Sequence, residues 1–269
     1  NDLSVTYAEL PDGWKDARDY LKDKLPPDKA RTKLVQLAAI LDGQAKYEES
    51  IELYQDLIAE DPTSPDLPDL LKRQINAYEL SNRPLEAEQT REKRIYALLP
   101  GQTWTRANED KAKSKIHKEN AADIYQVAMK LLIAAADEKN KDKQMADYAQ
   151  AEKWLALYLQ HYPNEDRAFD VTFSHAFVMD EQSDDALTQL KKSSKAQEFN
   201  HNSRLLLPKL EATAAEYQKI IDWNVSDDEM REQVMIAAYR QVFVYANILA
   251  TEDPNWSVVN SAKTQAFVE

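Results

Sequence analysis

Apolar residues recur along this chain at the spacing of one face of an α-helix. Trp14, Ala17, Tyr20 and Leu21 form one such stripe, with polar residues on the opposite side. The pattern predicts a lead-in over residues 1–10 followed by successive helices. These are expected over residues 11–25, 27–41, 47–59, 70–80, 84–99, 120–137, 148–161, 168–179, 184–197, 206–223 and 227–251.

Prolines mark the ends of several of these helices. Pro62, Pro100 and Pro163 each stand just after a segment with helical periodicity, and proline lacks the N–H group that continues a helix. Residues 101–119 are charged and poorly periodic, and residues 138–144 are polar. We therefore expect insertions between helices at these two places.

The composition agrees with a purely helical chain. Only three of the 269 residues are glycine, and none is cysteine. Rossmann and P-loop domains need glycine clusters where the backbone approaches phosphate, and β-sandwiches need glycine for positive φ angles in their hairpins. Both classes are disfavoured, and disulfides and cysteine-ligated zinc are excluded. The expected fold class is all-α.

The acidic charge bears on the partners that the chain can bind. The net charge is −13 and the sequence pI is near 4.9. Such a surface repels nucleic-acid phosphates and anionic lipid headgroups, so no nucleic-acid partner is expected. The longest apolar stretch, residues 127–136, is far shorter than the ~20 residues of a membrane-spanning helix, so no direct membrane span is expected.

Two segments share a pattern of aromatic, small and apolar residues that ends in proline. The shared positions are Tyr47, Ser50, Tyr54 and Pro62 in the first segment and Tyr148, Ala151, Leu155 and Pro163 in the second. A small residue lets two helices approach closely, and the large apolar residues fill the space between neighbouring hairpins. A unit of this kind cannot bury its apolar face alone, so copies of it stack.

This pattern resembles the tetratricopeptide repeat (TPR), a helix–turn–helix unit of ~34 residues. The resemblance implies an α-solenoid of antiparallel helical hairpins. We accordingly expect a lead-in and first helix over residues 1–29 and TPR-like repeats over residues 30–200, with insertions near 101–119 and 138–144. Residues 201–269 are expected to be a C-terminal region with a pair of long capping helices. An ordinary helical bundle without repeats is the alternative.

The resemblance also implies a function, which is that of a non-enzymatic scaffold or adaptor. TPR proteins bind a protein or peptide partner in a groove lined by the first helix of each hairpin. The corresponding positions are Thr32, Val35, Ala39, Lys72, Asn76, Glu79, Val171, His175 and Val178. Lys72 and Asn76 have the four-residue spacing with which some TPR domains hold a peptide C-terminal carboxylate, and both side chains can donate to it. The alternative is an ordinary exposed helix face.

Catalytic and metal-binding patterns are missing from the sequence. The four histidines form no HExxH motif and no pair four residues apart, as a two-histidine metal site on one helix needs. There is no GxSxG motif and no cysteine nucleophile. We therefore expect no enzyme activity, no cofactor and no metal. The alternative is a helical enzyme or small-ligand binder that uses carboxylates remote in sequence.

Two further expectations concern the setting of the chain. Residues 161–173 read Tyr-Pro, a short polar turn and an apolar helix from Ala168, and so resemble repeats of bacterial cell-envelope TPR proteins. This implies a periplasmic protein whose signal or lipid anchor precedes the sequence given; a cytoplasmic location is the alternative. A monomer or weak homo-oligomer is expected. In a self-associating structural component, the contact face would be Met230, Val234, Ala238, Val242 and Leu249. The alternative is that this face packs on the repeats of the same chain, as part of a capping helix pair.

Overall fold

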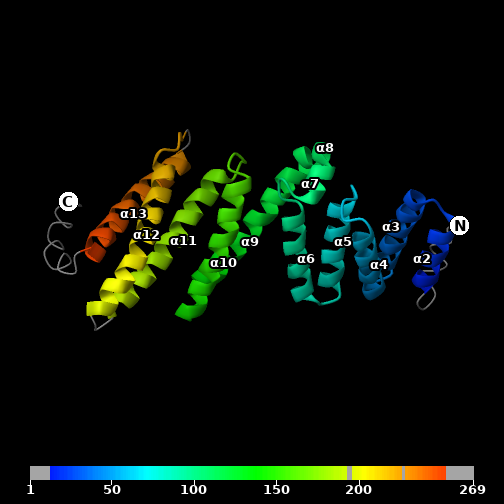
Figure 1. The fold of residues 1–269 in the computed structure, drawn as a ribbon, viewed down its shortest axis with the longest axis horizontal. Helices are drawn as coiled ribbons and strands as arrows, with labels where there is room; N and C mark the ends of the chain where they lie inside the picture. The colour runs from blue at the N-terminus through cyan, green and yellow to red at the C-terminus, as the bar shows by residue number, and fades with distance from the viewer. Residues whose placement is uncertain (1–12, 193–195, 226–227, 253–269) are drawn as a thin grey trace. The chain divides into compact units, whose positions relative to one another are not determined.

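The computed structural model describes residues 13–192, 196–225 and 228–252, and within these ranges all regular secondary structure is helical (Figure 1). The all-α prediction is confirmed. The elements are α2 (Gly13–Lys24), α3 (Pro27–Gly43), α4 (Tyr47–Glu60), α5 (Leu67–Leu80), α6 (Pro84–Ala97), α7 (Thr103–Ala107), α8 (Glu109–Lys111), a π-helical turn η1 (Ala112–Ile116), α9 (His117–Asp137), α10 (Lys141–His161), α11 (Ala168–Lys192), α12 (Ala196–Ile221) and α13 (Asp228–Glu252).

One long helix, α11, replaces the two helices expected over residues 168–179 and 184–197. Residues 180–183 contain no proline or glycine, and two of them, Asp180 and Ser183, are buried. Ser183 Oγ lies 3.4 Å from Thr213 Oγ1 of α12, and Asp180 contacts both α12 and α13. In the sequence, these polar residues indicate a break between two helices. In the structure, they lie within one continuous helix and contact its neighbours.

The two expected insertions are largely helical. Most of residues 138–144 belong to the start of α10, where the Asn140 side chain accepts a hydrogen bond from the Lys143 N–H at 3.1 Å and so caps the helix. Residues 101–119 form α7, α8, η1 and the start of α9. Weak periodicity at these positions indicates short helices rather than irregular chain.

The chain divides into two compact units, Asn1–Asn120 and Ala121–Glu269, and the division falls within α9. Each unit has its own buried hydrophobic core. The sequence analysis divides the chain at residues 29–30 and 200–201 according to the repeat pattern. Compact units are defined in a different way, so these divisions stay predictions.

In unit 1, each helix from α2 to α6 packs against the next along the chain. The main core lies between α2, α3, α4 and α5, where Leu34, Leu37, Tyr54 and Leu57 are at most 1% exposed. Burial of each leucine stabilises the fold by about 1.5–3 kcal/mol. The apolar stripes that predict the helices are thus the faces by which successive helices pack.

The α3–α4 and α5–α6 hairpins turn in the same way. Ala45 and Asn82 occupy the left-handed region, with φ of 58° and 59°. The N–H groups of Gln44, Ala45 and Lys46 donate to the carbonyls of Ile40, Asp42 and Leu41, and those of Ser81, Asn82 and Arg83 donate to the carbonyls of Ala77, Glu79 and Tyr78. Each residue of the second turn follows its equivalent in the first turn by the same number of residues. This separation along the sequence is slightly longer than the ~34-residue TPR unit.

A side-chain contact across the first hairpin also recurs in the second hairpin at the same separation along the sequence. The Tyr54 hydroxyl donates to Asp42 Oδ2 at 2.6 Å, and Arg91 Nη2 donates to Glu79 Oε1 at 2.7 Å. Asp42 and Glu79 are equivalent positions, as are Tyr54 and Arg91. A polar contact therefore joins the same two helix positions in both hairpins, although the residue types differ.

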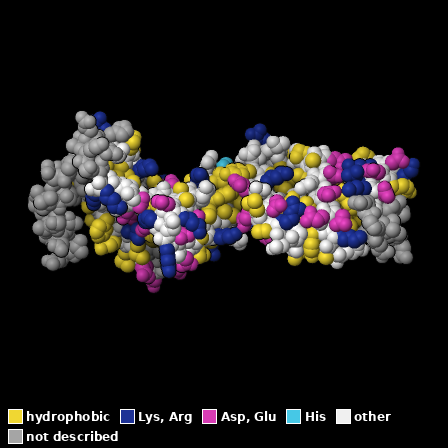
Figure 2. All heavy atoms as spheres, turned by 90° about the horizontal axis from the view of Figure 1, so that it is seen from below, with side chains coloured by type: hydrophobic (Ala, Val, Ile, Leu, Met, Phe, Trp, Pro, Cys, Tyr) yellow, Lys and Arg dark blue, Asp and Glu magenta, His cyan; other side chains and the backbone are white. Residues whose placement is uncertain are grey.

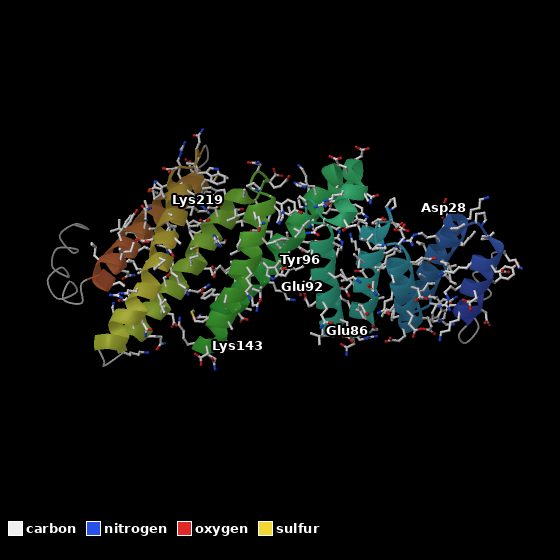
Figure 3. The ribbon with its side chains drawn as sticks, in the orientation of Figure 1. Asp28, Glu86, Glu92, Tyr96, Lys143 and Lys219 are labelled. Atoms are coloured by element: carbon white, nitrogen blue, oxygen red, sulfur yellow. The ribbon has the colours of Figure 1, made fainter. Side chains whose placement is uncertain are left out.

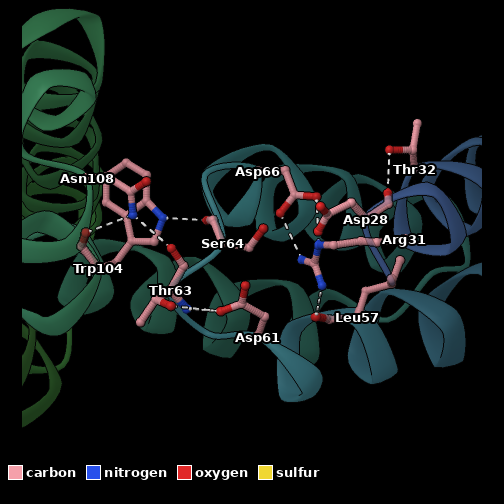
Figure 4. Close-up of polar contacts among 10 residues, drawn as sticks. All are labelled: Asp28, Arg31, Thr32, Leu57, Asp61, Thr63, Ser64, Asp66, Trp104 and Asn108. Atoms are coloured by element: carbon pink, nitrogen blue, oxygen red, sulfur yellow. Dashed lines mark hydrogen bonds and ion pairs between the residues drawn. The ribbon is translucent and has the colours of Figure 1, made fainter. Parts of the chain in front are cut away.

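The loop over residues 61–66 is held by side chains of α3 and α7 (Figure 4). Arg31 donates two hydrogen bonds to the Asp66 carboxylate, at 3.2 and 2.8 Å. Trp104 Nε1 donates to the Ser64 carbonyl at 2.7 Å, and Asn108 Nδ2 donates to the Thr63 carbonyl at 2.8 Å. Because Asp66 directly precedes α5, these contacts fix the start of α5 close to the first turns of α3.

In unit 2, the helices from α10 to α13 pack in chain order, and α11 also contacts α13. Their shared core includes Phe169, Ala176, Leu187, Leu210, Tyr217, Ala237 and Val244. Since α10, α12 and α13 all pack on α11, most of the surface of this helix is covered.

A polar network joins α11, α12 and α13 within this core. Asp180 Oδ2 accepts hydrogen bonds from the Tyr217 hydroxyl and from Arg240 Nη1, each at 2.9 Å. Arg240 also lies 3.5 Å from Glu181 and 4.7 Å from the centre of the Phe177 ring. Burial, followed by the charge of Asp180, raises the pKa of Tyr217, so the phenol stays protonated and donates.

Candidate functional site

Three of the predicted partner-binding residues lie on α3. Thr32 is exposed, and its hydroxyl donates to the Asp28 carbonyl one turn earlier, at 2.8 Å (Figure 4). Val35 and Ala39 are half-buried, and Val35 packs against the unit 1 core. This part of α3 therefore presents a narrow, mildly apolar surface.

The next three lie on an exposed stripe of α5. Lys72, Asn76 and Glu79 follow one another at spacings of one helical turn. Glu79 is engaged by Arg91 of α6. Within the described part of the chain, the Lys72 ammonium and the Asn76 amide have no hydrogen-bond or ion-pair partner. Both side chains are therefore available as donors to a ligand.

A second polar group, which the sequence reasoning missed, lies between α3, α4 and α5. Burial and the hydrogen bond to Asp42 raise the pKa of Tyr54, whereas the nearby Arg73 guanidinium acts in the opposite direction. Asp42 Oδ1 is buried and has no hydrogen-bond partner among the described residues. In the sequence, two features point to this polar group. Tyr54 is one of the residues of the repeat pattern, and Arg73 directly follows the predicted site residue Lys72. Arg73 is exposed, but it lies about 100° around α5 from Lys72 and therefore outside the stripe.

The three predicted residues on α11 do not form a groove. Val171 and Val178 are 0% exposed, so these two positions are core residues and the prediction for them is wrong. His175 is half-buried, and its Nδ1 lies 3.0 Å from Glu216 Oε1 of α12. The physical reason is that α10, α12 and α13 all pack on α11. These contacts bury positions that helical spacing alone would assign to a groove.

Glu216 is a buried carboxylate held by a lysine and by a histidine. Burial by itself would raise the pKa of this carboxyl, but hydrogen bonds with His175 and with Lys219 outweigh it and lower the pKa. The Lys219 ammonium lies 2.5 Å from Glu216 Oε2 (Lys219 is labelled in Figure 3). The arrangement joins α11 to α12 and explains the position of His175 without a ligand.

Unit 2 contains a hollow of about 310 Å³ between α10, α11 and α12. Met179, Pro208 and Ala212 give it an apolar lining, and Lys209 and Glu152 are among its polar residues. Its volume is at the lower end of the ~300–1,000 Å³ typical of small-ligand sites. A proline inside a helix, Pro208, is the only sequence signal for this site.

An acidic cluster on α11 is engaged by neighbouring side chains. Asp180 and Glu181 face Arg240, and Asp184 Oδ1 accepts from Asn247 Nδ2 at 2.9 Å. Burial, together with the charges of Asp180 and Glu181, raises the pKa of Asp184. The cluster thus acts as a set of contacts between α11 and α13.

Among the described residues, no group of three or more His, Cys, Asp or Glu side chains is placed to hold a metal ion. None of the helices described is both long and apolar enough to cross a membrane. In comparisons with known proteins, no family model matches the chain and no curated protein matches it.

Proposed function

We propose that the chain is a non-enzymatic adaptor of TPR type that binds a protein or peptide partner in a multi-protein assembly. The observation that carries the proposal is the exposed stripe of α5. There, Lys72 and Asn76 present donors that no described side chain engages, one helical turn apart. A carboxylate is the ligand that an ammonium and an amide at this spacing can bind together.

The hairpin geometry supports the solenoid part of the proposal. The α3–α4 and α5–α6 turns share their backbone hydrogen bonds and their left-handed residue, Ala45 or Asn82. Repeated hairpins of this kind stack so that equivalent helices line one surface. In this interpretation α3 and α5 are the first helices of consecutive repeats, and α12 and α13 are the capping pair.

The chemistry of the surface favours a peptide with a free carboxylate and apolar side chains. Lys72 and Asn76 supply positive charge and hydrogen-bond donors, while Val35 and Ala39 supply apolar contact. The contact between Arg31 and Asp66 keeps the starts of α3 and α5 together. Because these elements are helices, the backbone that carries the donors is ordered before the partner arrives.

The test measures the affinity of short peptides by fluorescence anisotropy, using random sequences that end in a free carboxylate or in an amide. Lys72→Ala and Asn76→Ala are each expected to weaken binding of the carboxylate peptides about 10- to 100-fold, since a hydrogen bond to a charged group contributes ~1.5–3 kcal/mol. Lys93→Ala, which removes an exposed lysine from α6, is the matched control.

Several results would reject the proposed surface. They are equal affinity for carboxylate and amide peptides, equal behaviour of Lys72→Ala and Lys93→Ala, and no binding of either peptide set. A purified chain that turns over a substrate would reject the non-enzymatic assignment.

The hollow in unit 2 favours a second candidate function, the binding of a small ligand. Ala212→Trp is expected to fill the hollow and to abolish ligand-induced stabilisation in a thermal-shift screen of small molecules. Ala215→Trp places the same side chain on an exposed part of α12 and is the control. If Ala212→Trp and Ala215→Trp respond alike, the hollow is not a ligand site.

The proposed setting is the periplasm of a bacterial cell, with the cytoplasm as the alternative. The support is the resemblance of residues 161–173 to repeats of envelope TPR proteins. Fractionation of cells that make the native protein tests this setting. Recovery with a periplasmic marker supports it, and recovery with a cytoplasmic marker overturns it.

A further inference from the structure

Helix α13 carries apolar side chains on two opposite sides. Its inner side packs on the unit 2 core through Ala237 and Val244, both 0% exposed. Its outer side exposes seven large apolar side chains, with exposed fractions between 40% and 67%: Met235, Ile236, Tyr239, Val242, Phe243, Tyr245 and Leu249. A helix that is apolar all round is normally buried all round, so the outer side lacks a partner within the described chain.

The outer side is also free of charge. Between Met235 and Leu249 the only charged residue is Arg240, and its guanidinium is held against Asp180 and Glu181 of α11. Tyr239 and Phe243 contact each other edge to face, with ring centres 4.8 Å apart. Figure 2 shows hydrophobic side chains gathered over the C-terminal helices of this unit. Exposed apolar patches of this kind mark protein–protein contacts.

The patch is large enough for a stable contact between two copies. Ile236 and Phe243 lie about 100–120° around the helix from Val242, at the edge of the patch. At about 200 Å² per fully exposed side chain, the exposed fractions of the other five correspond to about 530 Å² per copy. Two such patches would bury about 1,060 Å², which reaches the ~1,000 Å² that a specific interface should clear. The area therefore suffices without a contribution from any other helix.

The order of residues along the patch favours a second copy as the occupant. Tyr239 and Tyr245 stand three positions before and after Val242, and Met235 and Leu249 stand seven positions before and after it. In a helix these pairs lie on either side of the line through Val242. In a two-fold contact, residue i of one copy meets residue j of the other copy, and residue j meets residue i. A patch that packs against its own copy therefore needs apolar residues placed symmetrically about the axis.

We propose that the chain forms a homodimer in which the outer sides of two α13 helices pack antiparallel across a two-fold axis at Val242. Val242 then faces the partner's Val242. Tyr239 faces the partner's Tyr245, and Met235 faces the partner's Leu249. The contact uses unit 2 alone and does not depend on the peptide-binding surface of unit 1.

This face differs from the one that helical spacing indicates. Met230 and Val234 are half-buried and pack against the unit 2 core, so they belong to the inner side of α13, in agreement with the alternative that this face packs within the chain. Val242 and Leu249 are exposed as expected. Sequence periodicity could not choose between the two sides because both are apolar.

The first test is sedimentation of the full chain over a concentration series. We expect the mass of a dimer, and Val242→Glu is expected to weaken dimerisation by at least about 100-fold, because an unpaired buried charge costs ~3–5 kcal/mol. Ala215→Glu adds the same charge to an exposed site on α12 and should leave the dimer intact. Circular dichroism of both variants reports that they fold.

The second test determines the register by cysteine cross-linking, for which a chain without native cysteine is well suited. Val242→Cys is expected to form a disulfide-linked dimer on mild oxidation. Met235→Cys alone is not, because two copies of residue 235 would lie about 21 Å apart along antiparallel helices, beyond the ~4.4–6.8 Å Cα separation of a disulfide. A mixture of Met235→Cys and Leu249→Cys chains should cross-link.

Two outcomes overturn the proposal. A monomeric mass at every concentration would mean that another part of this chain, or a different protein, covers the patch. Cross-linking of Val242→Cys no faster than that of Met235→Cys would mean that the copies do not meet antiparallel at Val242.

Discussion

At the residue scale, Glu216 illustrates how a buried carboxyl keeps its charge. Its side chain is 7% exposed, and it is held by His175 of α11 and by Lys219 on its own helix. These hydrogen bonds lower its pKa against the effect of burial. A group whose pKa is lowered on folding stabilises the folded state above its ordinary pKa and loses this contribution as the pH falls through the folded value.

Replacement of this carboxyl should change the pH dependence of stability. In the native chain, the free energy of unfolding is expected to decrease as the pH falls below the ordinary value of 4.5. Glu216→Gln should decrease less steeply there, and at neutral pH it should be less stable by about 1–3 kcal/mol. Urea unfolding at a series of pH values measures both effects.

The control for this prediction is Glu211→Gln, which removes an exposed carboxyl from the same helix. It should leave both the stability and its pH dependence close to those of the native chain. Parallel pH curves for Glu216→Gln and the native chain would contradict the proposed role of this carboxyl.

At the scale of elements, the hairpin turns place different residues in the same backbone conformation. Ala45 and Asn82 both have positive φ, whereas Gly43, two residues before Ala45, is the last residue of α3. An alanine in this region is strained by ~1–2 kcal/mol, whereas asparagine tolerates it better. The second hairpin is therefore built with less local strain than the first.

This difference predicts the result of two glycine substitutions. Ala45→Gly should raise the free energy of unfolding by about 1 kcal/mol, because glycine adopts positive φ without steric cost. Asn82→Gly should raise it less. Urea unfolding compares the two, and a larger gain for Asn82→Gly, or a loss of stability for Ala45→Gly, would contradict the account.

Helices could be predicted from the sequence wherever an apolar stripe and a proline coincide, as at residues 47–62. The continuity of α11 could not, because Asp180 and Ser183 are polar and their partners on α12 and α13 are remote in sequence. Burial of Val171 and Val178 could not be predicted either, because the helices that cover them are also remote in sequence. The positions on α5 follow from periodicity alone, whereas the hollow beside Pro208 depends on how three helices meet.

At the scale of the whole molecule, each unit has a separate core, with buried clusters around α3 and α4 in unit 1 and around α11 to α13 in unit 2. In chains of stacked helices, stability is a sum of local terms between neighbours. Damage to one core should therefore be felt mainly by its own helices.

Arg240→Ala tests this independence. It leaves the buried Asp180 without its cation, which should lower the stability of unit 2 by about 2–4 kcal/mol, somewhat less than for a fully buried pair because Arg240 is 31% exposed. Hydrogen exchange should increase in α11 to α13 and stay unchanged in α3 to α5.

Arg231→Ala is the matched control, since it breaks an ion pair with Asp228 that is open to solvent. Exchange in unit 2 should then remain at the native level. Faster exchange in α3 to α5 of Arg240→Ala would show that the two cores are energetically coupled.

Four of the five tryptophans lie in the described part of the chain, and their placement gives an optical readout of unfolding. Trp14 and Trp104 lie in the core of unit 1 and are at most 3% exposed, whereas Trp154 and Trp223 of unit 2 are half-exposed. An indole shielded from water emits at shorter wavelength than one in contact with it. Fluorescence at the blue edge of the emission band should therefore follow unfolding of unit 1, without any added label.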